Sequence, residues 1–72
     1  ETIIKFGIPE RSKVKIEIYN ILGERVAELM NTELDAGYHQ VKWNANQFSS
    51  GIYIYSIRTE RFSDFKKMIL IK

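Results

Sequence analysis

Apolar and polar residues alternate with a period of two in several separate segments of this chain. Hydrophobic residues alternate with lysine and glutamate in segment 13–19, and with polar residues in segment 38–44. A period of two places successive side chains on opposite faces of a strand, so both segments are predicted to be half-buried β-strands. The side chains predicted to face the core are Val14, Ile16, Ile18, His39, Val41 and Trp43.

Four further segments complete the strand prediction. Segment 51–58 is apolar on both faces, which is typical of a central strand, while segments 2–8 and 65–72 open and close the chain as strands. Segment 24–30 has apolar residues at helical spacing, but a strand is favoured because seven residues make a marginal helix and the neighbouring segments are strands. Six or seven short strands joined by turns predict an antiparallel β-sandwich or a small barrel.

The size and composition of the chain limit how it can be stabilised. Its 72 residues make one domain, 1–72, and a domain this small buries only about 60% of its unfolded surface. The chain has no cysteine and one histidine, so we expect a dense apolar core in place of disulfides or a structural metal. The 11 basic and 9 acidic residues are scattered, which is not a nucleic-acid footprint. No apolar run approaches the roughly 18 residues of a membrane helix.

No catalytic or ligand-binding motif stands out. His39 is the single candidate general base, and its position on the inward face favours a packed or rim histidine. One histidine without cysteine does not make a zinc site, and the acidic residues lack the spacing of a calcium loop. The four glycines stand apart, so no phosphate-cradling loop is present. We therefore expect no enzymatic activity, no metal, no cofactor and no small-molecule ligand.

Two features leave alternatives open. Tyr53 and Tyr55 share a face and, with Trp43, suggest a sugar-stacking platform, but a small sandwich needs such rings for its core and the core role is favoured. At the carboxyl end, three lysines bracket the apolar run 68–71. Such lysines discourage aggregation of an edge strand, and they also suit a strand that a partner recognises.

Distinctive motifs follow one another in segments 3–9, 18–23 with Val26, 34–39, 41–44, 50–55 and 66–72. Taken together, their order resembles the C-terminal sorting domain of the bacterial type IX secretion system, and the resemblance covers nearly the whole chain. The chain is also similar to the immunoglobulin-like domain of flagellar hook-capping proteins. Ser12 and Asn44 depart from the sorting-domain pattern. Asn44 stands where the family usually has aspartate, and asparagine keeps the turn-forming ability of that residue.

The resemblance implies an immunoglobulin-like sandwich of about seven short strands at the carboxyl end of an exported protein. It implies passage through the periplasm to the outer-membrane surface or the medium, recognition by the translocon and shuttle proteins, and cleavage before Glu1 by a sortase-like peptidase. The implied recognition strand consists of Lys66, Lys67, Met68, Ile69, Leu70, Ile71 and Lys72. The implied structural motif residues are Leu22, Gly23, Gly37, Trp43, Gly51 and Tyr53.

Two other functions compete with the sorting signal. The first is a structural accessory module of a secreted or surface protein, which would make protein contacts without an export role. The second is carbohydrate binding, which needs a flat, exposed aromatic surface. An exposed edge strand also makes self-association by sheet extension an expectation to test.

Overall fold

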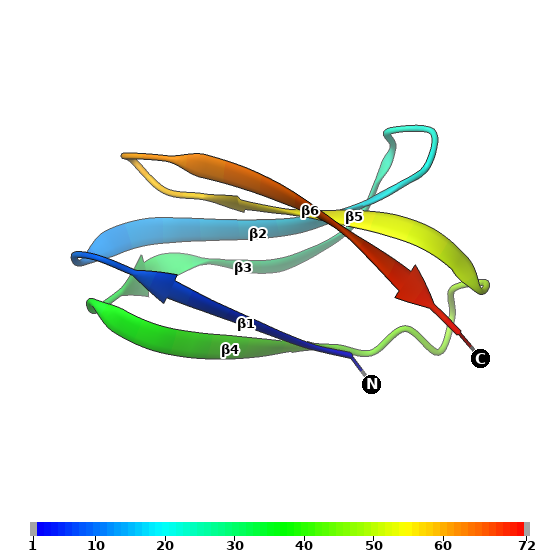
Figure 1. Cartoon of the computed structure of the whole chain (residues 1–72), viewed down its shortest axis with the longest axis horizontal. Helices are drawn as coiled ribbons and strands as arrows, with labels where there is room; N and C mark the ends of the chain where they lie inside the picture. Colours follow the sequence, from blue (N-terminus) through cyan, green and yellow to red (C-terminus); the bar gives the residue numbers. More distant parts are fainter. Residues whose placement is uncertain (1, 72) are drawn as a thin grey trace.

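The computed structural model describes residues 2–71, which form six strands and no helix. This part of the chain therefore holds no helix that could cross a membrane. The strands form two antiparallel sheets, one with the order β3-β2-β5-β6 and the other with β1 beside β4 (Figure 1). Their bounds are β1 (Thr2–Ile8), β2 (Ser12–Asn20), β3 (Arg25–Leu34), β4 (Gly37–Trp43), β5 (Gly51–Arg58) and β6 (Ser63–Leu70).

The predicted all-β antiparallel sandwich is confirmed, but the expectation of about seven strands is wrong. Within residues 2–71, strands β1 and β4 correspond to strands B and E of an immunoglobulin domain. Strands β3, β2, β5 and β6 correspond to C′, C, F and G, and no strand in this range corresponds to A or D. No strand forms between β4 and β5. There the Asn44 side chain accepts a hydrogen bond from the Asn46 backbone (3.2 Å), and the Phe48 N–H donates to the Ala45 carbonyl (3.0 Å). These local bonds hold the segment as a turn.

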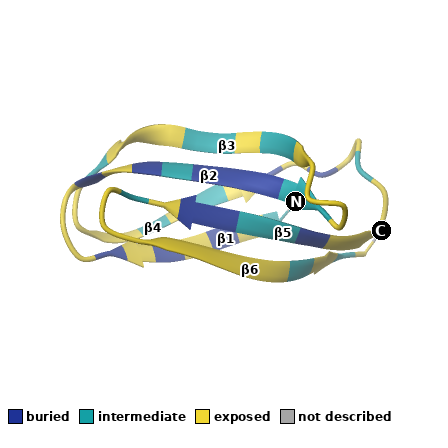
Figure 2. Cartoon of the chain, turned by 90° about the horizontal axis from the view of Figure 1, so that it is seen from above, coloured by how far each residue is buried: buried dark blue, intermediate teal, exposed yellow. Residues whose placement is uncertain are grey.

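The core lies between the two sheets, as the alternation in β2 predicts. Val14, Ile16 and Ile18 are each 0% exposed. Figure 2 shows the buried residues as a band along the two middle strands, β2 and β5. The prediction that segment 51–58 is a central strand is thus confirmed, because β5 pairs with both β2 and β6. In β4, His39 and Val41 are only half-buried, and Trp43 is buried.

The segment with helical spacing is a strand, as favoured, and it extends to Leu34. The register between β2 and β3 shifts twice, between Ile16 and Glu17 and between Ile18 and Tyr19. Val26 and Leu29 are the unpaired residues of β3 at these two bulges. A bulge inserts one residue and interrupts the alternation of faces, which explains why apolar residues of this strand recur at helix-like intervals.

The two ends of the sandwich differ in character. At one end, Arg11 makes ion pairs with Glu33 (3.1 Å) and Asp35, and Arg61 pairs with Glu10. These pairs are largely exposed, so each contributes little to the free energy of unfolding. Strand β1 begins and strand β6 ends at the opposite end (Figure 1).

Candidate recognition surface

The carboxyl-terminal strand β6 lies at the edge of the larger sheet. Within the described sheet it pairs with β5 on one side only, so its other side presents backbone N–H and C=O groups for pairing. The strand begins at Ser63 rather than at Phe65 and ends at Leu70. Ile71 follows the strand and is 84% exposed, and Lys72 lies outside the described residues.

The side chains of β6 divide between anchors and exposed groups. Met68 and Leu70 are half-buried and pack against the core. Ile69 is 65% exposed on the outer face. Lys66 and Lys67 are both exposed, and as consecutive residues of a strand they point to opposite faces. A partner lying on one face of the sheet therefore meets only one of the two lysines, whereas a partner at the open edge reaches both.

The motif residues occupy turns and the core. Gly23 (φ 84°) and Gly37 (φ 128°) have backbone conformations that other residues rarely adopt. Gly51 begins β5. Trp43 and Tyr53 are buried, with ring centroids 5.3 Å apart. Leu22 also lies in a turn, where its apolar side chain is 80% exposed.

The hairpin between β2 and β3 is held by its own hydrogen bonds. The Asn20 side-chain oxygen accepts from the backbone N–H groups of Leu22 and Glu24, both at 3.0 Å. The Asn20 backbone N–H donates to the Glu24 carbonyl (3.0 Å), and the Gly23 N–H donates to the Asn20 carbonyl (3.0 Å). This ordered turn holds Ile21 and Leu22 in solvent, at 71% and 80% exposure. Leu22 was assigned to the structural motif on the resemblance alone, and its exposure was not predicted.

The aromatic residues considered for sugar stacking lie in the core. Trp43 is 2% and Tyr53 8% exposed, and the Phe48 ring packs against Trp43 with centroids 5.2 Å apart. The Tyr53 hydroxyl donates to the Ser49 carbonyl (2.8 Å), and Tyr55 is half-buried. These rings therefore do not form an exposed stacking platform.

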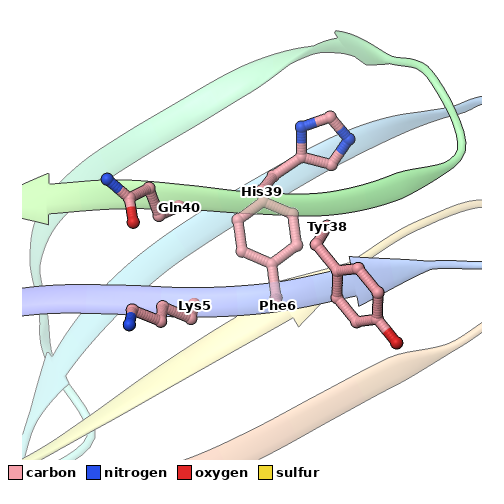
Figure 3. Close-up of a pocket in the computed structure, with 5 residues that line it drawn as sticks. All are labelled: Lys5, Phe6, Tyr38, His39 and Gln40. Carbon is pink, nitrogen blue, oxygen red and sulfur yellow. The ribbon is translucent and has the colours of Figure 1, made fainter.

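A hollow of about 460 Å³ lies at the β1–β4 sheet and is lined by Lys5, Phe6, Tyr38, His39 and Gln40. Figure 3 shows that these side chains point in different directions rather than toward a common centre. His39 Nε2 lies 2.7 Å from the Asp35 carbonyl, and its ring packs against Phe6 (5.7 Å between centroids). Tyr38 is 95% exposed and lies over Gly7. Residues 2–71 contain no group of three or more His, Cys, Asp or Glu placed to hold a metal ion.

Glu17 is a buried charge that sequence reasoning placed on an open, charged face. Its side chain is 4% exposed although it points outward from β2. Arg25 donates to one carboxylate oxygen (2.9 Å) and Tyr19 to the other (3.1 Å), and the Lys15 ammonium lies 3.9 Å away. The hydrogen bond from Arg25 is the main cause of a lowered pKa for Glu17, against the opposing effect of burial.

Acidification is expected to destabilise the domain partly through Glu17. Because its folded-state pKa lies below the unfolded value, its stabilising effect is present above about pH 4.5 and is lost as the pH falls through the folded-state pKa. The free energy of unfolding should fall between pH 7 and pH 3 in both proteins, and the fall should be about 1 kcal/mol smaller in Glu17→Gln than in the wild type. The difference is no larger because Arg25, the partner of Glu17, remains half-exposed to solvent. Urea titrations at several pH values test this.

Glu33→Gln is the matched control for this test. Glu33 also pairs with an arginine, but both side chains are 60% exposed. We expect this variant to follow the pH dependence of the wild type. Equal pH profiles for Glu17→Gln and the wild type would contradict the assignment to Glu17.

Fold and surface together define a small antiparallel β-sandwich domain whose last strand is an open edge. The family model described as secretion system C-terminal sorting domain matches residues 1–72, the whole chain. The chain therefore belongs to this family, the sorting domains of type IX secretion. Membership makes it a sorting-signal domain for export toward the cell surface or the extracellular space, a role that is generally non-catalytic. Comparisons with curated proteins and with solved structures gave no significant match.

Proposed function

We propose that this domain directs the protein that carries it from the periplasm through the outer-membrane translocon of type IX secretion, and on to attachment at the cell surface. The observation that carries the proposal is the family match over the whole chain, combined with the open edge of β6. The proposed recognition segment is 66–72, as the resemblance implied. The domain itself acts as the targeting signal and catalyses no reaction.

Edge pairing is the recognition mode that this strand supports best. A partner strand that pairs with the open edge of β6 forms backbone hydrogen bonds with it, and its alternating side chains contact both faces of the sheet. Lys66 and Lys67 lie on opposite faces and are both exposed, so an edge partner contacts both cations. Met68 and Leu70 keep β6 packed against the core while the partner binds.

The proposed partners follow the route of export. The translocon and its shuttle proteins would bind the folded domain, and a sortase-like peptidase would then take the chain as its substrate. Attachment of the carried protein to the surface would follow this cleavage.

The test is an export assay in a host with a working type IX system. A fluorescent reporter with a periplasmic signal carries residues 1–72, either intact or ending after Phe65. We expect export of the intact fusion and periplasmic retention of the truncated one. Because truncation removes most of β6 and affects folding, Lys66→Glu/Lys67→Glu is the second variant, with an expected export of about one tenth of wild type.

Lys5→Glu/Lys42→Glu is the matched control for charge reversal. Both lysines are exposed and lie on the smaller sheet, away from β6. We expect its export to equal that of the wild type. If reversal on β6 and reversal on the smaller sheet lower export equally, recognition by β6 is excluded and net charge explains the loss.

A structural accessory module is the competing function, and the same open edge favours it. In that case the intact fusion stays in the periplasm although the domain is folded, and its partner is a protein other than the secretion machinery. Self-association through β6 is tested by sedimentation. A single species near 8.5 kDa over a wide concentration range would exclude it.

A further inference from the structure

The outer face of the larger sheet carries an apolar surface beside the proposed recognition strand. Ile52 of β5 is paired with Ile69 of β6, and the two side chains are 39% and 65% exposed. Phe65 is 55% exposed on the same face, next to the half-buried Ile54. Side chains at i and i+2 share a face of a strand, so these four residues form one continuous patch.

The hairpin between β2 and β3 converts part of this face into a hollow. Figure 1 shows the hairpin curling away from the β1–β4 sheet, toward the outer side of the larger sheet. A hollow of about 280 Å³ results, lined by Tyr19, Gly23, Ile54, Arg58 and Phe65. The hydrogen bonds of Asn20 keep the hairpin in place, so this wall is formed before any partner binds.

Two cations border the hollow. The Arg58 guanidinium lies over the Phe65 ring, 5.8 Å from its centroid. Lys67 is exposed beside it, across from Ile54. Neither cation takes part in any ion pair found among residues 2–71. The carboxylate of the neighbouring Glu17 is already occupied by Arg25, Tyr19 and Lys15.

We propose that this outer face docks an extended apolar segment of a partner protein that carries acidic side chains. Apolar side chains of that segment would fill the hollow over Ile54, and its carboxylates would pair with Arg58 and Lys67. Aromatic and arginine side chains are the residue types that most often dominate binding energy at protein interfaces. A second copy of this chain is a poor occupant, because a two-fold contact centred on the hollow would bring the cations of the two copies together.

This proposal rests on the proposed function, since the segment would belong to the secretion machinery and would bind in addition to the edge of β6. The two contacts share Lys67 but otherwise use different parts of the strand. One uses the backbone edge of β6, and the other uses side chains that project from the face of β5 and β6.

Two surface variants test the contact in the export assay described above. Phe65→Ser and Arg58→Glu should each lower export about tenfold while leaving the thermal midpoint within a few degrees of wild type. Ile3→Ser and Lys5→Glu are the matched controls on the outer face of β1, where Ile3 is 48% exposed, and both should export normally. Normal export of Phe65→Ser and Arg58→Glu would overturn the proposal.

A direct binding experiment separates this proposal from the proposed function. The probe is 8-anilinonaphthalene-1-sulfonate, an apolar anion, titrated into the isotope-labelled 72-residue chain. Amide shifts should centre on Gly23, Ile54 and Arg58, and Arg58→Glu should weaken binding about fivefold. Shifts centred elsewhere, or equal affinity for the variant, would exclude the hollow. If the intact reporter is not exported, the proposed function fails, and this titration still decides whether the hollow binds apolar anions.

Discussion

Replacing Ile16 by alanine is expected to lower the free energy of unfolding by about 3 kcal/mol. Ile16 lies in the central strand β2 and is 0% exposed. The truncation removes buried methyl groups and leaves a cavity that a packed core fills only in part. A domain of this size is stable by about 4–10 kcal/mol in total, so the loss is a large fraction. The other buried members of its cluster are Phe6, Ile8, Val14 and Ile57.

Urea unfolding followed by far-ultraviolet circular dichroism measures this loss. Ile16→Val removes a single methylene group and should cost about 1 kcal/mol. Ile69→Ala is the exposed counterpart, at 65% exposure, and should change the free energy of unfolding by less than about 0.5 kcal/mol. A similar loss for Ile16→Ala and Ile69→Ala would contradict the assignment of these residues to core and surface.

Trp43→Ala is expected to cost about 4 kcal/mol, because Trp43 joins three parts of the molecule. It is the last residue of β4 and is 2% exposed. Its ring packs on Phe48 in the loop 44–50 and on Tyr53 in β5, with centroids 5.2 and 5.3 Å away. Its loss therefore removes buried area and also loosens the loop and the contact between the sheets.

Hydrogen exchange distinguishes this variant from Ile16→Ala. The Phe48 amide donates to the Ala45 carbonyl, and this turn is covered by the Trp43 ring. In Trp43→Ala, the Phe48 amide should therefore lose more protection against hydrogen exchange than the lower global stability explains. In Ile16→Ala, the protection of this amide should fall only as far as the global stability does. Trp43→Phe keeps a ring in the cluster and should lose about half as much stability. If Trp43→Ala unfolds at the wild-type urea concentration, the aromatic cluster is not a source of stability.

The edge strand reconciles the two interpretations of the terminal lysines. Exposed lysines on an edge disfavour pairing with a second copy of the same chain, because like charges would meet. The same lysines favour a partner with complementary charge, and backbone pairing then adds affinity. One strand can in this way resist self-association and still be recognised.

The sequence predicted the strands well wherever alternation was clean. β2 was placed correctly because one of its faces is apolar and the other is polar. β5 was placed correctly because it is apolar on both faces. The same reasoning gave an ambiguous result for β3, where two bulges displace Val26 and Leu29 from the alternation. Bulges depend on how two strands pair, and no single strand sequence shows them. A seventh strand was expected from the resemblance, and residues 2–71 form six.

The recognition surface was only partly visible in the sequence. The terminal lysines and the apolar run after them were found from their position and spacing, and their role remains a prediction. The hollow on the outer face was missed, because Gly23 and Phe65 are far apart in the chain and meet only when β5 brings β2 and β6 together. The exposure of Leu22 was missed because an apolar residue in a turn motif resembles a packed one.

By itself, the sequence determined that this protein is an all-β sandwich with a core made by the alternating residues of β2 and the rings near Trp43. This follows because the period of apolar residues sets which strand faces can be buried. Only the tertiary structure decided which outward-facing residues are covered. Glu17 and Arg58 both alternate outward, yet Glu17 is enclosed by groups from β2 and β3 while Arg58 remains exposed. The difference arises because burial on the outer face depends on the neighbours that strand pairing supplies.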